Sequence, residues 1–91
     1  MKFQKICVLG LGYIGLPTAS TLATHGLKVV GVDTNPHVIE TLQKRNIHIH
    51  EPGLRAAVEL ALDSGNLVVS ARPEEADAFL IAVPTPFYED N

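Results

Sequence analysis

Residues 10–17 of the chain read GLGYIGLP, with three glycines and one proline in eight positions. They follow the apolar run Ile6–Leu9 and precede a stretch with a helical pattern, although glycine and proline destabilise helix interiors more than any other residues. The glycines match the pattern G-x-G-x-x-G at a junction between a strand and a helix. There Gly10 permits a tight turn, Gly12 lets the backbone approach a pyrophosphate, and Gly15 allows close packing of helix on sheet. The junction therefore predicts a dinucleotide-binding loop.

Four short apolar runs, rich in Val, Ile and Leu, predict the strands of one sheet. They are continuous rather than alternating, which is typical of parallel strands that helices bury on both faces. The runs are Ile6–Leu9, Val29–Val32, Leu67–Val69 and Phe79–Val83.

Three helical patterns lie between these strands. The first covers residues 14–25. The second begins with Asn35 as a good N-cap and Pro36 at the first helical position. In the third, apolar residues from Leu54 to Leu62 recur at helical spacing, and Gly65 ends the run.

The predicted order of elements is β-α-β-α-α-β-β, which indicates an α/β, Rossmann-type doubly wound parallel sheet with strand order 3-2-1-4. The chain stops just after the fourth strand, whereas a complete dinucleotide domain contains two such halves. Residues 1–91 are therefore expected to form the N-terminal part of an NAD-binding Rossmann domain, truncated after the fourth strand, with the remaining domains of the enzyme absent.

Asp33 ends the second predicted strand, where an acidic side chain can accept hydrogen bonds from the adenosine ribose hydroxyls. Thr34, Asn35 and Pro36 follow, and no adjacent Arg or Lys could neutralise a 2′-phosphate. This favours NAD over NADP as the cofactor. The structural alternative is an ordinary glycine turn followed by an aspartate that caps a helix.

Composition excludes several classes of function. The 91 residues carry a formal net charge of −3 without a basic cluster, which argues against a nucleic-acid partner. The longest purely apolar run is six residues, far below the roughly 20 that span a bilayer, so no membrane partner is expected. The N-terminus lacks the apolar region of a signal peptide, and the expected location is cytoplasmic.

Three other features have ordinary structural interpretations. Cys7 lies in the first apolar run and is expected to be core packing. Glu51 is expected to begin the third helix, where an acidic residue suits the helix dipole. His48 and His50 alternate in the segment IHIH, but two ligands are too few for a typical zinc site. No metal site is predicted.

Four segments resemble the UDP-glucose/GDP-mannose dehydrogenase family: GLGYIGLPTA, VDTNPHVIETL, IHIHEPGL and ADAFLIAVPTPF. The likeness spans essentially the whole chain. It implies a domain that binds NAD in an enzyme that oxidises C6 of a UDP-linked sugar from alcohol to carboxylate with two NAD per turnover. It favours UDP-N-acetyl-D-mannosamine as substrate, with UDP-glucose the alternative, and implies a homo-oligomer and a role in polysaccharide synthesis.

The resemblance also implies roles for individual residues. Tyr13 and Ile14 would lie against the cofactor, Asp33 would hold the adenosine ribose, and Thr85 would contact NAD at the end of the fourth strand. The family's catalytic groups lie beyond residue 91, so no residue of this chain is assigned a catalytic role.

A regulatory domain that binds NAD without chemistry is a second hypothesis, because it would share the glycine loop and the acidic strand end. The segments EPGL and VPTP favour the dehydrogenase over this alternative.

Overall fold

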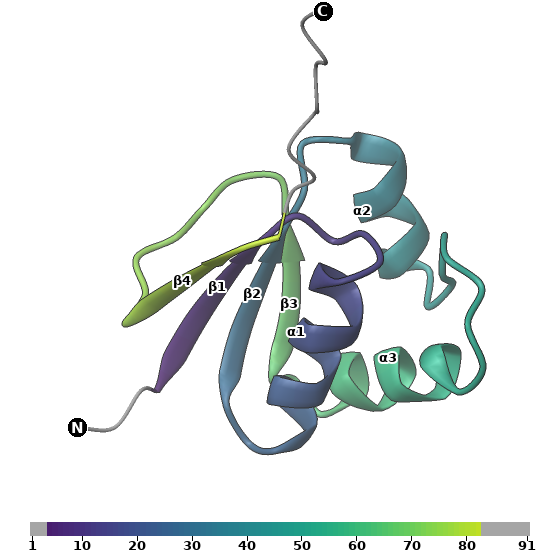
Figure 1. The fold of residues 1–91 in the computed structure, drawn as a ribbon, viewed down its shortest axis with the longest axis horizontal. Helices are drawn as coiled ribbons and strands as arrows, with labels where there is room; N and C mark the ends of the chain where they lie inside the picture. Colours follow the sequence, from purple (N-terminus) through teal and green to yellow (C-terminus); the bar gives the residue numbers. More distant parts are fainter. Residues whose placement is uncertain (1–3, 83–91) are drawn as a thin grey trace, which may run out of the picture.

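A computed structural model describes residues 4–82 of the protein (Figure 1). It contains four strands, β1 (Lys5–Leu9), β2 (Lys28–Val32), β3 (Leu67–Ser70) and β4 (Ala78–Ile81), and three helices, α1 (Gly15–Thr24), α2 (Pro36–Gln43) and α3 (Leu54–Asp63). All strand pairs are parallel, and the order in the sheet is β3-β2-β1-β4. The predicted α/β fold, element order and strand order are confirmed. None of the helices within this described range is long and apolar enough to cross a bilayer.

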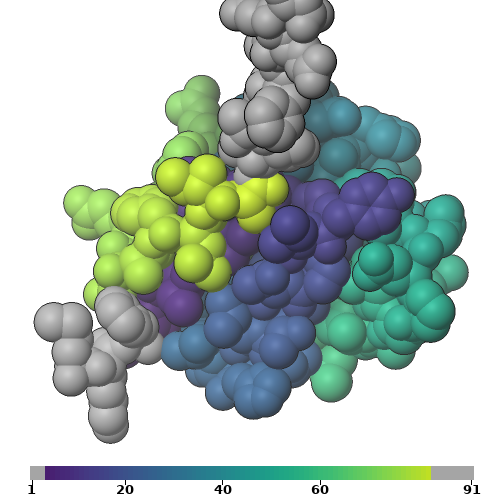
Figure 2. Space-filling view, viewed as in Figure 1, coloured from purple at the N-terminus to yellow at the C-terminus, as the bar shows by residue number. Residues whose placement is uncertain are grey.

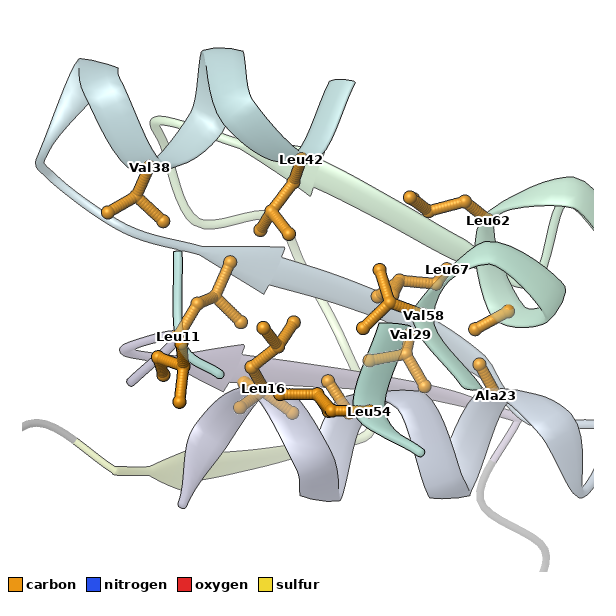
Figure 3. Close-up of a cluster of buried hydrophobic side chains, with 14 of the residues drawn as sticks. Leu11, Leu16, Ala23, Val29, Val38, Leu42, Leu54, Val58, Leu62 and Leu67 are labelled. Carbon is orange, nitrogen blue, oxygen red and sulfur yellow. The ribbon is translucent and has the colours of Figure 1, made fainter. Parts of the chain in front are cut away.

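All three helices cover the same face of the sheet (Figure 1). Side chains from alternate strand positions, such as Val8 and Val29, pack with Leu16, Leu42 and Val58 of the helices into one buried cluster (Figure 3). Successive right-handed crossovers that run in one direction along a sheet place their helices on one face. This arrangement accounts for a single helical layer.

The opposite face carries no helix among residues 4–82. The expectation of strands buried on both faces is confirmed for the central strands β1 and β2, and it is wrong for the edge strands β3 and β4, which are partly or largely exposed. Cys7 and Val30 are buried there in a small cluster to which Ala76, from the loop 71–77, also belongs. Phe79 and Ile81 of β4 are 50% and 73% exposed. Continuous apolar runs show that a strand is suited to burial, but they do not show which other segment buries it.

Helix α3 begins later than expected. Glu51 lies in a turn before the helix, and the Leu54 N–H donates to the Glu51 carbonyl at 3.1 Å. Pro52 disfavours helical backbone at the residue before it, and Gly53 has a left-handed φ of 79°. The helix therefore starts at Leu54, and the predicted acidic residue in its first turn is absent.

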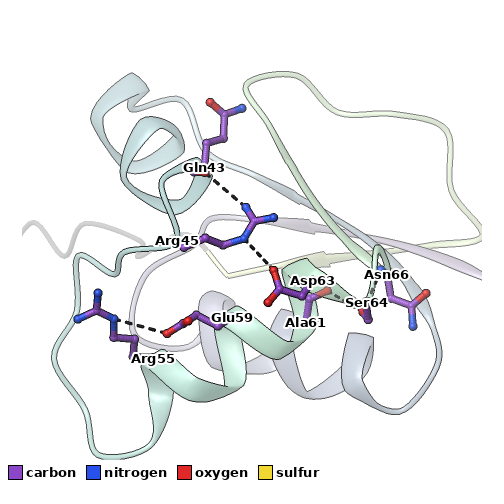
Figure 4. Close-up of polar contacts among 8 residues, drawn as sticks. All are labelled: Gln43, Arg45, Arg55, Glu59, Ala61, Asp63, Ser64 and Asn66. Atoms are coloured by element: carbon purple, nitrogen blue, oxygen red, sulfur yellow. Dashed lines mark hydrogen bonds and ion pairs between the residues drawn. The ribbon is translucent and has the colours of Figure 1, made fainter.

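The segment 44–53 joins α2 to α3 and is fixed at its start. Two residues after the end of α2, Arg45 lies in the left-handed region, at φ 63°. The Arg45 Nε donates to Asp63 Oδ1 at 3.0 Å, which links the end of α2 to the end of α3 (Figure 4). Further along, Ile49 is buried in the main core. Arg45 and Ile49 thus hold the segment against the rest of the domain.

Candidate functional site

The carboxyl ends of β1, β2 and β4 meet at one edge of the sheet. Leu9 pairs with Val32 on one side and with Ile81 on the other. The glycine loop leaves β1 at this edge, and the Gly10 N–H donates to the Val32 carbonyl at 2.7 Å. Ligands of open parallel sheets bind outside this edge, next to the first strand.

Gly15 is required by the packing of the loop itself. A Cβ atom at Gly15 would overlap the carbonyl oxygen of Gly10 and would lie 3.2 Å from the Cβ of Ala82. Gly10 in turn has a left-handed φ of 101°, a conformation that glycine adopts without steric cost. The close contact predicted for Gly15 and the tight turn predicted for Gly10 are both present.

Gly12 presents the opposite situation. A Cβ atom placed there would meet no atom within 4 Å, and its backbone φ is not in the left-handed region. Nothing in the fold of the described residues therefore demands glycine at this position. The open space at Gly12 fits a ligand that needs to approach the backbone closely, as a pyrophosphate does.

The space at Gly12 adjoins the amino end of α1. Ile14 is the N-cap, and no side chain caps the helix or places an acidic group in its first turn. The unpaired N–H groups at a helix start carry partial positive charge and bind anions. Pro17 lies in this first turn, where a missing N–H costs little. This end of α1 is suited to a phosphate group.

Asp33 lies half-buried just after β2, and both of its carboxylate oxygens are engaged. Oδ2 accepts from the Leu11 N–H at 3.0 Å, and Oδ1 accepts from the Asn35 N–H at 2.9 Å. The cap of α2 is instead Asn35, whose side chain accepts from the His37 N–H. The interpretation of Asp33 as the helix cap is therefore wrong. A carboxylate has about four acceptor sites, so two remain for ribose hydroxyls.

An apolar pocket of about 260 Å³ opens beside Asp33. Leu9, Val32 and Ile81 contribute its walls from the ends of three strands, and Pro73 contributes from the loop 71–77. A flat aromatic base fits such walls, with a carboxylate at one side to hold an attached sugar. The loop 71–77 gave no signal of this role in the sequence.

Two residues that support the glycine loop were missed by sequence reasoning. The side chain of Leu11 is fully buried (Figure 3). A Cβ atom at Gly31 would lie 2.9 Å from a methyl group of Leu11, so glycine in the middle of β2 makes room for the loop. A glycine inside a strand is the available signal, because it often marks a close approach of another chain segment.

His48 is a third residue with an unexpected position. Its Nε2 lies 2.6 Å from the Leu11 carbonyl oxygen, across the gap between the segment 44–53 and the glycine loop. No group of three or more potential metal ligands occurs among residues 4–82.

The family model for the UDP-glucose/GDP-mannose dehydrogenase family, NAD binding domain, matches residues 4–91 of the chain. The chain belongs to this dehydrogenase family. Its cofactor is NAD, as the loop and the acidic strand end predicted.

Several members of the family are similar to this domain in sequence or in structure. It is 53% identical over 90 residues to the UDP-N-acetyl-D-mannosamine dehydrogenase of Campylobacter jejuni, covering 99% of this chain and 22% of that protein. The structure of the UDP-N-acetyl-mannosamine dehydrogenase from Staphylococcus aureus matches with a TM-score of 0.92 and 53% identity, over 94% of this chain and 21% of that one. A UDP-glucose dehydrogenase from Pyrobaculum islandicum matches with a TM-score of 0.81 and 40% identity, over 93% and 21%. The chain spans about a fifth of the length of these proteins.

Other predicted cofactor contacts of the dehydrogenase domain remain predictions. Tyr13 and Ile14 are 74% and 71% exposed at the start of α1, beside the glycine loop. Large apolar side chains with this exposure are available to cover a ligand. Thr85 lies outside the described residues.

Proposed function

We propose that this chain is the NAD-binding part of a longer UDP-sugar 6-dehydrogenase, as its predicted domain organisation suggests. The observation that carries the proposal is the open backbone at Gly12, next to the uncapped start of α1 and the Asp33 carboxylate. The pyrophosphate of NAD would lie at Gly12 and Gly15, the adenosine ribose would bind Asp33, and the adenine would enter the apolar pocket. Tyr13, Ile14 and Thr85 would complete the contacts.

NAD supplies the hydride acceptor when it is bound. Oxidation of a primary alcohol to a carboxylate releases four electrons, and each NAD takes up two, so the proposed reaction consumes two NAD for each sugar. The residues of this chain hold and orient the cofactor. Groups outside these 91 residues would bind the sugar and carry out its oxidation.

We propose UDP-N-acetyl-D-mannosamine as the substrate, because relatives of that name share 53% identity with this chain. UDP-glucose is the second candidate, supported by the 40% identity to a UDP-glucose dehydrogenase. The intact protein is further proposed to be a homo-oligomer in the cytoplasm with a role in polysaccharide synthesis.

The preference for NAD tests the proposed role of Asp33. The 2′-phosphate of NADP would lie against the Asp33 carboxylate, and the two negative charges would repel each other. Titration calorimetry of the intact protein should therefore show much weaker binding of NADP than of NAD. Asp33→Ala should weaken NAD binding and reduce the difference between the affinities for NAD and for NADP. Equal affinity of the unaltered protein for both would contradict the proposal.

The substrate is tested separately, by NADH absorbance with the intact protein. Reduction of NAD should be faster with UDP-N-acetyl-D-mannosamine than with UDP-glucose, and the product should be the uronic acid. Binding of NAD without its reduction by either sugar would instead indicate a regulatory NAD-binding domain.

A further inference from the structure

The segment that joins α2 to α3 reaches across to the glycine loop through one side chain. His48 and Leu11 are 37 positions apart in the sequence, and the Nε2 to carbonyl oxygen distance is 2.6 Å. The neighbouring Ile49 is only 7% exposed and packs in the main core. The backbone that carries His48 is therefore anchored, and its ring meets the loop from a fixed position.

Leu11 is held on three sides. Its N–H donates to Asp33 Oδ2 at 3.0 Å, its carbonyl oxygen accepts from His48, and its side chain is fully buried. It stands between the two glycines whose freedom would otherwise make the loop flexible. His48 and Asp33 thus restrain the same residue from opposite ends of its backbone.

The restraint extends to Gly12. The carbonyl of Leu11 and the N–H of Gly12 belong to one planar peptide unit. A hydrogen bond that fixes the direction of the carbonyl also fixes the direction of the N–H. Gly12, which carries that N–H, borders the open space where the proposed pyrophosphate would bind.

We propose that His48 is a positioning residue for NAD, which holds the Leu11–Gly12 peptide in the orientation that the pyrophosphate needs. The inference rests on the proposed NAD site. It gives the segment IHIHEPGL a role in cofactor binding without any direct contact with the cofactor.

The chemistry of the ring defines the test. A carbonyl only accepts hydrogen bonds, so Nε2 must carry the proton. Nδ1 is then a bare acceptor, and it is buried without a partner among residues 4–82. A glutamine side chain is long enough to place an amide N–H near the position of Nε2, whereas that of asparagine is one bond too short. His48→Gln therefore keeps a donor near the position of Nε2, and His48→Asn removes it, while both residues are polar.

The experiment compares His48→Gln with His48→Asn in the intact protein, with His50→Asn as the matched control. His50 belongs to the same alternating pair, but its side chain is exposed. The dissociation constant for NAD should rise about tenfold in His48→Asn, the effect of one lost hydrogen bond of ordinary strength. It should stay within about twofold of the unaltered protein in His48→Gln and in His50→Asn.

Two results would overturn the inference while the unaltered protein still binds NAD: equal loss of affinity in His48→Asn and His48→Gln, or no loss in His48→Asn. Failure of the unaltered protein to bind NAD would instead overturn the proposed function. A second measurement needs no variant. The ¹⁵N chemical shifts of the His48 ring should show a protonated Nε2 and a bare Nδ1, and the opposite tautomer would contradict the proposed contact.

Discussion

Gly12 and Gly15 are three residues apart, yet an added methyl group would meet very different surroundings at the two positions. At Gly15 it would overlap the backbone of Gly10, and at Gly12 it would enter open space. One glycine is therefore needed by the fold, and the other is needed by the proposed ligand. The two glycines of this loop thus have distinct physical reasons to be glycine.

This contrast gives a prediction at the residue scale. Gly12→Ala should change the free energy of unfolding by no more than about 0.5 kcal/mol, as is usual where a side chain meets nothing. It should nevertheless weaken NAD binding by at least about tenfold, because the methyl group would occupy the space of the pyrophosphate. Gly15→Ala should destabilise the protein by about 3 kcal/mol or more, because backbone atoms have to move.

Thermal denaturation and calorimetry of both variants, measured side by side, check these values. A Gly12→Ala protein that binds NAD as tightly as the unaltered protein would show that the pyrophosphate does not lie at this residue.

At the scale of elements, one carboxylate joins β1 to β4. Asp77 Oδ2 accepts from the Gln4 N–H at 2.8 Å and from the Lys5 N–H at 2.9 Å. The Asp77 N–H in turn donates to the Lys5 carbonyl at 2.8 Å. The backbone hydrogen bonds from Gln4 and Lys5 lower the pKa of Asp77 below its ordinary value of 3.8. These contacts fix the register at which β4 begins to pair with β1.

The lowered pKa of Asp77 predicts a pH dependence of stability. Because the pKa is lower in the folded protein than in the unfolded chain, the stabilisation is complete above pH 3.8 and is lost as the pH falls through the folded value. Asp77→Asn should therefore be less stable than the unaltered protein at neutral pH, and the difference should shrink below pH 3.8. Denaturant titrations at several pH values measure this. A difference that stays constant down to strongly acid pH would rule out the carboxylate as its cause.

At the scale of the whole molecule, β4 is one of the two edge strands of the described sheet and the more exposed of them. It pairs only with β1 among the described strands, and its residues lie on the surface (Figure 2). Phe79 is 50% exposed and Ile81 is 73% exposed. An apolar edge strand is a template for pairing with another chain, and exposed apolar patches tend to find partners.

We therefore expect the isolated 91-residue chain to self-associate through β4. Light scattering should show a molecular mass that rises with concentration, and Phe79→Lys should reduce it toward that of the monomer. Leu60→Lys serves as the control, because Leu60 is 62% exposed on α3, away from this edge. Equal behaviour of the two variants would show that association does not depend on β4.

The local pattern of residues was sufficient to predict the framework of the domain and the backbone geometry of the glycine loop. Each strand and helix was expected within a few residues of its observed bounds, and the order 3-2-1-4 followed from crossover rules. The turn at Gly10, the close contact at Gly15 and the place of Asp33 beside them could be predicted because strand ends in a parallel sheet meet at one edge. These features depend on neighbours in sequence and on topology that all chains share.

The support of the loop was decided only by the tertiary structure. Leu11 is held by Asp33, by His48 and by the space at Gly31, and these partners come from distant parts of the sequence. A hydrogen bond between residues 37 positions apart produces no periodic pattern in the sequence from which it could be predicted. Periodicity shows which side chains are suited to burial or binding, whereas the partner of each is determined by the folded chain.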